Sequence, residues 1–245
     1  MNRGGLPSQN FGKAKSPELV IFVIESTIRE RMKHILKAGL IVLLSLVLSI
    51  SVKAQREGWK QNKTRDGKVL VSYNFLEHKD ESGKKYNVLE FEAVTTAEVS
   101  MASCLKVLKD DSKHKDFMDD AEHTERIRDL SEDEWLSYYL LKKHWPMPVS
   151  DVVTRYKLEE DSKNNRITLT GFPAPDMYEE QGVERMRHSF STYTLTDKGN
   201  GQTEVMMYSS SVPLASIPKM LLATWIPNGP AAIVNGIIRL ALEEE

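Results

Sequence analysis

The sequence has little of what several common protein scaffolds need. Its 245 residues include one cysteine, Cys104, so the chain can form no internal disulfide and no zinc site built from several thiolates. The 33 Lys and Arg residues are matched by 35 Asp and Glu, which leaves a net charge of -2. Proteins that grip a nucleic-acid backbone need an excess of positive charge. We therefore expect no nucleic-acid partner.

Long apolar runs are also scarce, and none reaches the roughly 20 residues of a membrane-spanning helix. The longest run, residues 38–52, follows Lys33 and Lys37 and is followed by Lys53 and Ala54. A short basic region, an apolar core of about 7 to 15 residues and small residues before the cut are typical of a secretory signal peptide. We expect residues 32–54 to be this peptide, cleaved after Ala54. An uncleaved anchor and a buried core helix are the alternatives.

Residues 1–31 precede this segment, although a signal peptide normally starts at the beginning of the chain. We therefore expect translation to begin at Met32, with residues 1–31 a mis-annotated extension or a disordered leader. The mature chain, residues 55–245, would be periplasmic or secreted. It carries 25 Lys and Arg against 32 Asp and Glu, a net charge of -7. Such a charge disfavours loose adhesion to anionic lipid headgroups.

The mature chain reads as many strands and few helices. Segments rich in Val, Tyr and Phe, separated by turn residues, predict strands at 68–75, 86–95, 124–129, 135–143, 152–159, 166–172, 185–196 and 203–211. Apolar spacing predicts a helix over 97–108, capped by Thr96, and a short helix around 114–118. The block 216–242 is helical in period, but Pro227-Asn228-Gly229-Pro230 must break or kink it, and we expect a hinge there. This order predicts an α+β fold, in which a curved antiparallel sheet wraps around a long C-terminal helix and leaves an internal apolar cavity between them.

Three sets of residues carry a resemblance to a known family. They are Trp59-Lys60 ahead of Asp66-Gly67-Lys68-Val69, the tract Trp145-Pro146-Met147-Pro148-Val149-Ser150-Asp151-Val152-Val153, and the late run Phe190, Tyr193, Leu195, Gly201, Thr203, Val205, Tyr208 and Ile217-Pro218. Together they resemble the StAR-related lipid-transfer (START) domain over nearly all of residues 57–242. The chain departs from the family at Val152-Val153, where Arg-Asp is common, and at Tyr193, where Trp is frequent. The resemblance implies a helix-grip fold holding one sterol, phospholipid or isoprenoid-like molecule beneath the C-terminal helix.

Candidate ligand-binding residues follow from that arrangement, because apolar walls supply most of the affinity in such sites and a few polar groups orient the ligand. The apolar candidates lie in the C-terminal block and are Met220, Leu221, Trp225, Ile233 and Ile237. The polar candidates are Arg187, Tyr138 and Tyr208. The apolar residues could equally be plain core, and Arg187 could lie on a solvated outer face. Strand parity separates Tyr138 from Tyr139 but leaves open which of the two faces the cavity.

Catalytic signals are few. The sequence contains no Gly-x-Ser-x-Gly elbow, no His-Glu-x-x-His pair and no glycine-rich phosphate loop. A metal site could be drawn through a polar cluster, but the cluster lacks calcium-loop spacing and is expected to be a solvated surface; its members are His114, Asp116, Asp119, Asp120 and His123. Cys104 is expected to be a small buried hydrophobe. We expect no catalytic residue, no metal and no cofactor.

The resulting hypothesis is an exported, monomeric lipid-binding or lipid-transfer protein that contacts membranes transiently and holds one hydrophobic ligand. The alternative is an enzyme of the polyketide cyclase or dehydratase kind on the same fold. Such an enzyme needs acid or base groups converging in its pocket. Tyr138, Tyr139, Tyr208 and Arg187 are possible donors, but the strands offer no obvious His-acid pair. A third reading is an interaction module with a vestigial cavity.

Overall fold

The computed structural model describes residues 58–245 of the chain. The expected leader, signal peptide and cleavage site fall outside the described residues and remain predictions. Within residues 58–245, no helix is both long enough and apolar enough to cross a membrane.

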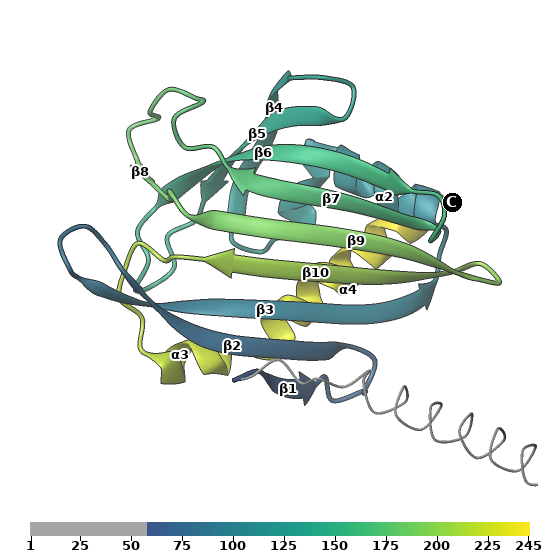
Figure 1. The fold of residues 1–245 in the computed structure, drawn as a ribbon, viewed down its shortest axis with the longest axis horizontal. Coiled ribbons are helices and arrows are strands. Elements are labelled where there is room, and N and C mark those ends of the chain that lie inside the picture. Colours follow the sequence, from purple (N-terminus) through teal and green to yellow (C-terminus); the bar gives the residue numbers. More distant parts are fainter. Residues whose placement is uncertain (1–57) are drawn as a thin grey trace, which may run out of the picture. The chain divides into compact units, whose positions relative to one another are not determined.

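A single antiparallel sheet runs through the described part of the chain (Figure 1). Its strands follow one another in space in the order β1 (Lys60–Lys63), β2 (Leu70–Lys79), β3 (Lys85–Glu98), β10 (Gln202–Ser211), β9 (Ser189–Gly199), β7 (Arg166–Pro173), β6 (Ser150–Asp161), β5 (Glu134–Leu141) and β4 (Ala121–Asp129). The short β8 (Glu184–Arg185) pairs in parallel with β6. The last long strand therefore lies beside the first hairpin, which joins the two ends of the domain.

Helices cover one face of this sheet. The crossover from β3 to β4 is made by α2 (Met101–Lys109) and the 3-10 helix η2 (Asp111–Asp116), and the chain ends in α3 (Lys219–Thr224) and α4 (Asn228–Leu242). α4 packs across β2, β3 and β10 and against α2, and it passes behind the strands in Figure 1. This arrangement confirms the predicted α+β helix-grip fold.

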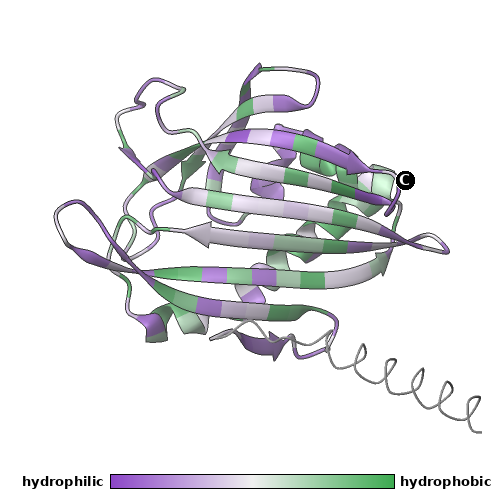
Figure 2. Ribbon diagram, viewed as in Figure 1, coloured by the Kyte–Doolittle hydropathy of each residue, from purple (hydrophilic) through white to green (hydrophobic). Residues whose placement is uncertain are grey.

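Along the strands, side chains that face the helices alternate with side chains that face outward, as expected for a sheet with one face covered. Inward-facing positions of the central strands form the main core with α2 and α4. In Figure 2 the hairpin loops are largely hydrophilic, whereas hydrophobic residues recur along the strands and on the helices. A second, small cluster lies on the opposite face, where Leu136, Tyr138, Val153 and Ala174 pack together. Trp135 and Tyr139 belong to the main core, which settles the parity question that the sequence left open.

Two helix boundaries differ from the prediction. The helix expected over 97–108 begins only at Met101, and its N-cap is Ser100, whose hydroxyl accepts from the Ser103 amide at 3.0 Å. Thr96, the predicted cap, lies within β3 opposite Glu204 of β10. Pairing with β10 extends the strand by several residues beyond its local signal. The short helix expected around 114–118 is the 3-10 helix η2, which starts earlier.

The C-terminal block also differs in detail. The covering segment is two helices, and the interruption between them lies at residues 225–227 rather than at 227–230. Pro227 is the N-cap of α4 and Pro230 lies in its first turn, where a missing amide hydrogen leaves no intrahelical bond unmade. The expected strand 185–196 is likewise split into β8 and β9. The hinge expected at residues 227–230 remains a prediction.

The Ser150-Asp151 end of the proline tract has a structural role. Asp151 is fully buried and receives two hydrogen bonds from Arg185, at 2.8 and 2.6 Å. The same guanidinium donates to the carbonyl oxygens of Pro175, Tyr178 and Glu179. One arginine thus links the β7–β8 loop to the start of β6. Its two hydrogen bonds to Asp151 form the bidentate pair for which the guanidinium is suited.

Candidate ligand-binding cavity

A cavity of about 570 Å³ lies between the sheet and the helices. This volume falls in the range of sites that enclose one small molecule. Its walls come from β3, β5, β6, β9 and β10, from α3 and the first turns of α4, and from the loop at 142–149.

The helix wall of the cavity is apolar. Leu221, Leu222, Trp225, Ala232 and Ile233 line it. The Trp225 ring meets Phe91 edge-on at a centroid distance of 5.3 Å.

The same indole lies directly over Gly229. A Cβ atom at position 229 would come within 1.8 Å of the Trp225 ring. The ring can occupy this position only because residue 229 has no side chain.

Exposed apolar side chains in the 142–149 loop and in α3 mark these two segments as the entrance of the cavity. Trp145 lines the cavity yet is 80% exposed, and Met220, next to Leu221, is 82% exposed. Of the lining residues, Asp119 and Asp120 lie in the segment before β4, and Lys142 and His144 lie in the 142–149 loop itself. The entrance is thus an apolar rim with charges of both signs beside it.

The sheet wall of the cavity is rich in hydroxyl groups. Ser189 and Ser191 of β9 stand opposite Ser211 and Ser209 of β10 in the sheet register, and all four line the cavity. The hydroxyls of Ser189 and Ser211 hydrogen-bond each other at 3.1 Å. The helix side of the cavity is therefore mostly hydrocarbon, whereas the sheet side combines these hydroxyls with apolar side chains such as Leu89 and Met207.

A buried chain of polar groups lies beside the cavity, on the inner face of the sheet beneath η2. Tyr139 and Tyr156 line the cavity, and their hydroxyl oxygens lie 2.8 Å apart. The Tyr139 hydroxyl lies 2.7 Å from Nδ1 of His114, whose Nε2 is 3.0 Å from the carbonyl oxygen of Leu108. His114 is 1% exposed and stacks on the Tyr139 ring.

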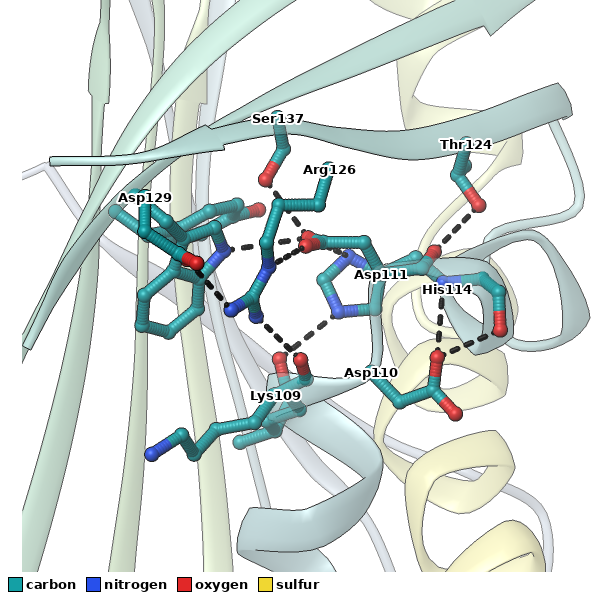
Figure 3. A network of polar contacts seen from close by, with 12 residues as sticks. Lys109, Asp110, Asp111, His114, Thr124, Arg126, Asp129 and Ser137 are labelled. Carbon is teal, nitrogen blue, oxygen red and sulfur yellow. Dashed lines mark hydrogen bonds and ion pairs between the residues drawn. The ribbon is translucent and has the colours of Figure 1, made fainter. Parts of the chain in front are cut away.

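Behind His114 lies a buried carboxylate, Asp111 (Figure 3). It accepts hydrogen bonds from Ser137 at 2.7 Å, from the Trp135 indole at 3.3 Å and from Nε of Arg126 at 2.7 Å. Nδ1 of His114 is more distant from this carboxylate, at 3.8 Å. Arg126 therefore supplies the opposite charge that a buried carboxylate requires, and the imidazole need not.

The imidazole of His114 is neutral in this setting. Burial lowers its pKa below the ordinary 6.5, and the nearby Asp111 offsets that effect only in part. A carbonyl oxygen can only accept, so Nε2 carries the proton that faces Leu108. Nδ1 of the neutral ring must then accept from the Tyr139 hydroxyl. Burial also raises the pKa of both Tyr139 and Tyr156, so the whole chain is uncharged.

The predicted apolar residues fall into two groups. Leu221, Trp225 and Ile233 line the cavity, as the C-terminal helix stripe indicated. Met220 is exposed beside the entrance, and Ile237 is fully buried in the core between α4 and the sheet. Their contact with a ligand stays a prediction.

The predicted polar residues lie elsewhere, and their expected place in the cavity is wrong. Arg187 precedes β9 on the exterior, where it pairs with Asp176 at 2.5 Å. Tyr138 lies in the outer cluster against Tyr178. Tyr208 has the opposite parity to the lining residues of β10, and its hydroxyl donates to Glu90 at 2.9 Å.

Sequence reasoning missed the polar residues that do line the cavity or support its wall. His114 was read as part of a solvated surface, but η2 turns it inward. Within residues 58–245, no group of three or more His, Cys, Asp or Glu could hold a metal. Cys104 is buried as predicted, and burial raises the pKa of its thiol to about 11.

Comparison with known proteins agrees with this geometry. The fold is that of StAR-related lipid-transfer (START) domains. A Xanthomonas axonopodis STAR-related lipid transfer protein superposes with a TM-score of 0.63 at 20% identity, over 76% of this chain and 99% of that one. Human STARD10 gives 0.60 at 16% identity, over 80% and 78%, and human StAR-related lipid transfer protein 5 gives 0.59 at 10%, over 85% and 98%.

Sequence comparison alone is less informative. A Pseudomonas aeruginosa protein described as uncharacterized is 26% identical over 198 residues, which cover 80% of this chain and 93% of the other. No family model matches the chain.

Proposed function

We propose that this chain is an exported carrier that binds one hydrophobic molecule in its cavity and transfers it between membranes. The observation that carries the proposal is the cavity of about 570 Å³, walled on one side by the apolar residues of α3 and α4 and open at an apolar rim. Similarity in fold to solved structures described as lipid transfer proteins supports it. At about 25 cal/mol per Å² of buried apolar surface, such a wall supplies most of the affinity without a charged partner.

The entrance favours brief contact with a membrane. Trp145 and Met220 expose large apolar side chains there, and Lys142, Lys143 and Lys219 lie in the same two segments. Tryptophan is favoured at the membrane–water interface, and lysines are attracted to anionic headgroups. The net negative charge of residues 55–245 disfavours adhesion over the rest of the surface, so contact through the entrance alone suits a carrier that must leave again.

Native mass spectrometry of the protein purified from its own host is the first test. A co-purifying lipid, and its passage between liposomes when the protein is added, would support the carrier. Ala232→Phe, which fills space on the cavity wall, should lower both lipid loading and transfer. Asn235→Phe is the matched control, because Asn235 is exposed on the same helix and does not line the cavity. A protein that neither retains nor transfers lipid would favour the interaction module.

One observation favours the enzyme alternative enough to test it. The imidazole of His114 contacts the hydroxyl of Tyr139, and both Tyr139 and Tyr156 line the cavity, as a proton relay to the cavity would require. The co-purified ligand should be incubated with the protein and recovered. Unaltered ligand supports the carrier, whereas a converted product would replace it with a cyclase-like enzyme.

Export is tested separately. The basic-apolar-Ala54 order predicts a mature N-terminus at Gln55. N-terminal sequencing of the native protein should find this residue first. Intact residues upstream of Met32 would overturn both the cleavage and the start at Met32.

A further inference from the structure

We propose that His78 and His188 form a binding site for one transition-metal ion of the Zn²⁺, Ni²⁺ or Cu²⁺ kind on the outer face of the sheet. The centroids of the two imidazole rings lie 5.3 Å apart, and the ring planes are tilted by 49°. The inference goes beyond the proposed function, because the site lies outside the cavity and takes a different ligand. The two histidines are more than 100 residues apart in the chain, so no spacing motif reveals the pair.

Strand parity places both side chains on the face away from the cavity. His78 of β2 stands opposite Tyr86 of β3, and the residue after Tyr86, Asn87, lines the cavity. Likewise Ser189, the residue after His188, lines the cavity. Neighbouring residues of a strand point to opposite faces, so both imidazoles point outward. His188 is exposed and His78 is half-buried, and an ion from solution can therefore reach them.

Backbone pairing holds both histidines in place. His78 lies within β2, and His188 directly precedes β9, where its carbonyl oxygen accepts from the Val212 amide at 2.9 Å. β3 and β10 lie between β2 and β9 in the sheet. At about 4.8 Å per strand, β2 and β9 would be about 14 Å apart in a flat sheet. The curvature of the sheet brings the two side chains together, so a shared ion would link strands that are not neighbours.

The ring nitrogens of the pair are available to a metal. Within residues 58–245, no hydrogen bond or ion pair engages the imidazole of His78 or of His188. By contrast, both ring nitrogens of His114 have partners, and the His123 ring lies 3.5 Å from a carboxylate. Imidazole nitrogen is the side-chain ligand that zinc, nickel and copper ions commonly take in proteins.

The separation of the rings agrees with a shared ion. A zinc–nitrogen bond is about 2.0 to 2.1 Å long and lies in the plane of the imidazole ring, which places the ion about 3.2 Å from the ring centroid. Two rings on one tetrahedral ion then have centroids about 5.2 Å apart. Rotation about the metal–nitrogen bonds leaves this distance unchanged, so the tilt of the planes is compatible with it. An aromatic contact alone also falls in this range, and the experiment below separates the two.

Water must complete the coordination shell. Among the described residues, no group of three or more His, Cys, Asp or Glu could hold a metal, so the protein supplies the two imidazoles alone. Arg187, the cation beside His188 in the chain, is paired with Asp176. A site made of two imidazoles favours transition-metal ions over Mg²⁺ and Ca²⁺, which take oxygen ligands.

Calorimetric titration of the native protein, free of any affinity tag, tests the site. We expect one zinc ion per chain and no binding of magnesium. Because the folded state holds the ion and the unfolded chain separates the two histidines, zinc should also raise Tm. At ten times its Kd, the expected rise is about 3 to 6 °C for a domain of this size.

Variants assign the ion to the pair. His78→Gln and His188→Gln should each lower zinc affinity by at least about tenfold, since even the loss of a residue that orients a metal ligand costs about that much. The double variant should lose little more than either single variant, because one remaining imidazole no longer chelates. His144→Gln is the matched control. It removes an imidazole at the cavity entrance and should bind zinc as the wild type does.

Several results would overturn the site. Losses that add in the double variant would mean two independent histidines rather than one shared ion. Unchanged affinity in His78→Gln or His188→Gln would leave an aromatic contact only, and a loss in His144→Gln alone would move the zinc to the cavity entrance. Absence of saturable zinc binding at millimolar concentration would also overturn it. None of these results bears on the carrier, whose test is lipid loading and transfer.

Discussion

The two ends of the inner sheet face differ although the same strands make both. Along β10 the inward residues run Val205, Met207, Ser209 and Ser211, and along β9 they run Leu195, Tyr193, Ser191 and Ser189. The apolar end lies under α2 and the later turns of α4, where the core is closed. The hydroxyl end lies under α3 and the first turns of α4, where the cavity remains.

This difference teaches how folding and binding are divided within one sheet. At the closed end, each apolar side chain is buried by another helix, and close packing stabilises the fold. At the open end, serines stand on β9 and β10 in place of large side chains that would fill the space beneath α3 and the first turns of α4. The closed end should therefore dominate the free energy of unfolding, and the open end should dominate ligand affinity.

The largest expected effect compares two isoleucines one turn apart on α4. Ile237 is 0% exposed in the closed core, and Ile233 borders the cavity. Ile237→Ala should lower the free energy of unfolding by about 2 to 5 kcal/mol, because it leaves a new void in a packed core. Ile233→Ala should cost clearly less, since its side chain already faces empty space. Urea denaturation measures both, and equal losses would contradict the division.

A second effect compares two tryptophans at the open end. Trp225→Ala should weaken binding of a hydrophobic ligand by about 1 to 3 kcal/mol through lost apolar contact. Trp145→Ala, which removes a lining side chain that is mostly exposed, should weaken affinity in solution much less than Trp225→Ala does, but slow delivery to vesicles. Titration and a liposome transfer assay separate the two. Identical behaviour of both variants would show that the rim has no separate role.

The third effect is the pH dependence of stability, to which we expect His114 to contribute. Burial lowers the pKa of folded His114 below 6.5, so the unfolded chain binds the proton first as the pH falls. Stability should therefore decrease below about pH 6.5, by up to about 1.4 kcal/mol per pH unit, until His114 itself titrates in the folded state.

Urea midpoints between pH 7 and pH 5 measure that slope. His114→Gln should lose the His114 part of the slope, whereas His123→Gln, at an exposed position, should retain it. A slope that is the same in wild type and His114→Gln would rule out His114 as its source.

The smallest effect is chemical accessibility. Cys104 is buried at the closed end and its thiol pKa is raised to about 11, so a thiol reagent at pH 8 should modify it only on unfolding. A Ser209→Cys variant, at the open end, should react in the folded protein, and bound ligand should protect it. Rapid native labelling of Cys104 would show that the closed end opens readily.

Much of the fold was predictable because its signals are local. Strand segments such as 166–172 and 203–211 carry Val, Leu and Thr between turn residues, and their boundaries were close to those observed. The prediction that Thr96 caps the helix was wrong, because Thr96 pairs with β10. That strand lies more than 100 residues later in the chain, so local sequence does not reveal the pairing. Trp225 and Ile233 were found because helical spacing places them on one stripe.

The polar half of the cavity was not predictable in the same way. Tyr139 and Tyr156 have the right parity, but parity assigns a side chain to a face only once the covering helices are known. His114 lies in a stretch of charged residues that reads as solvated surface. Its burial depends on η2, Tyr139 and Leu108 meeting in space, and no spacing along the chain encodes that meeting.

The grip of Arg185 on the β7–β8 loop has a consequence for protein engineering. Its hydrogen bonds reach the carbonyl oxygens of residues 175, 178 and 179, and Asp151 holds it from the sheet. Residues 180–182 lie beyond this anchor and are exposed. A peptide epitope or a fluorescent reporter inserted after Glu180 would therefore follow a segment that Arg185 holds in place. Met186, a few residues later in the chain, lines the cavity. Such an insertion could report on filling of the cavity without entering it.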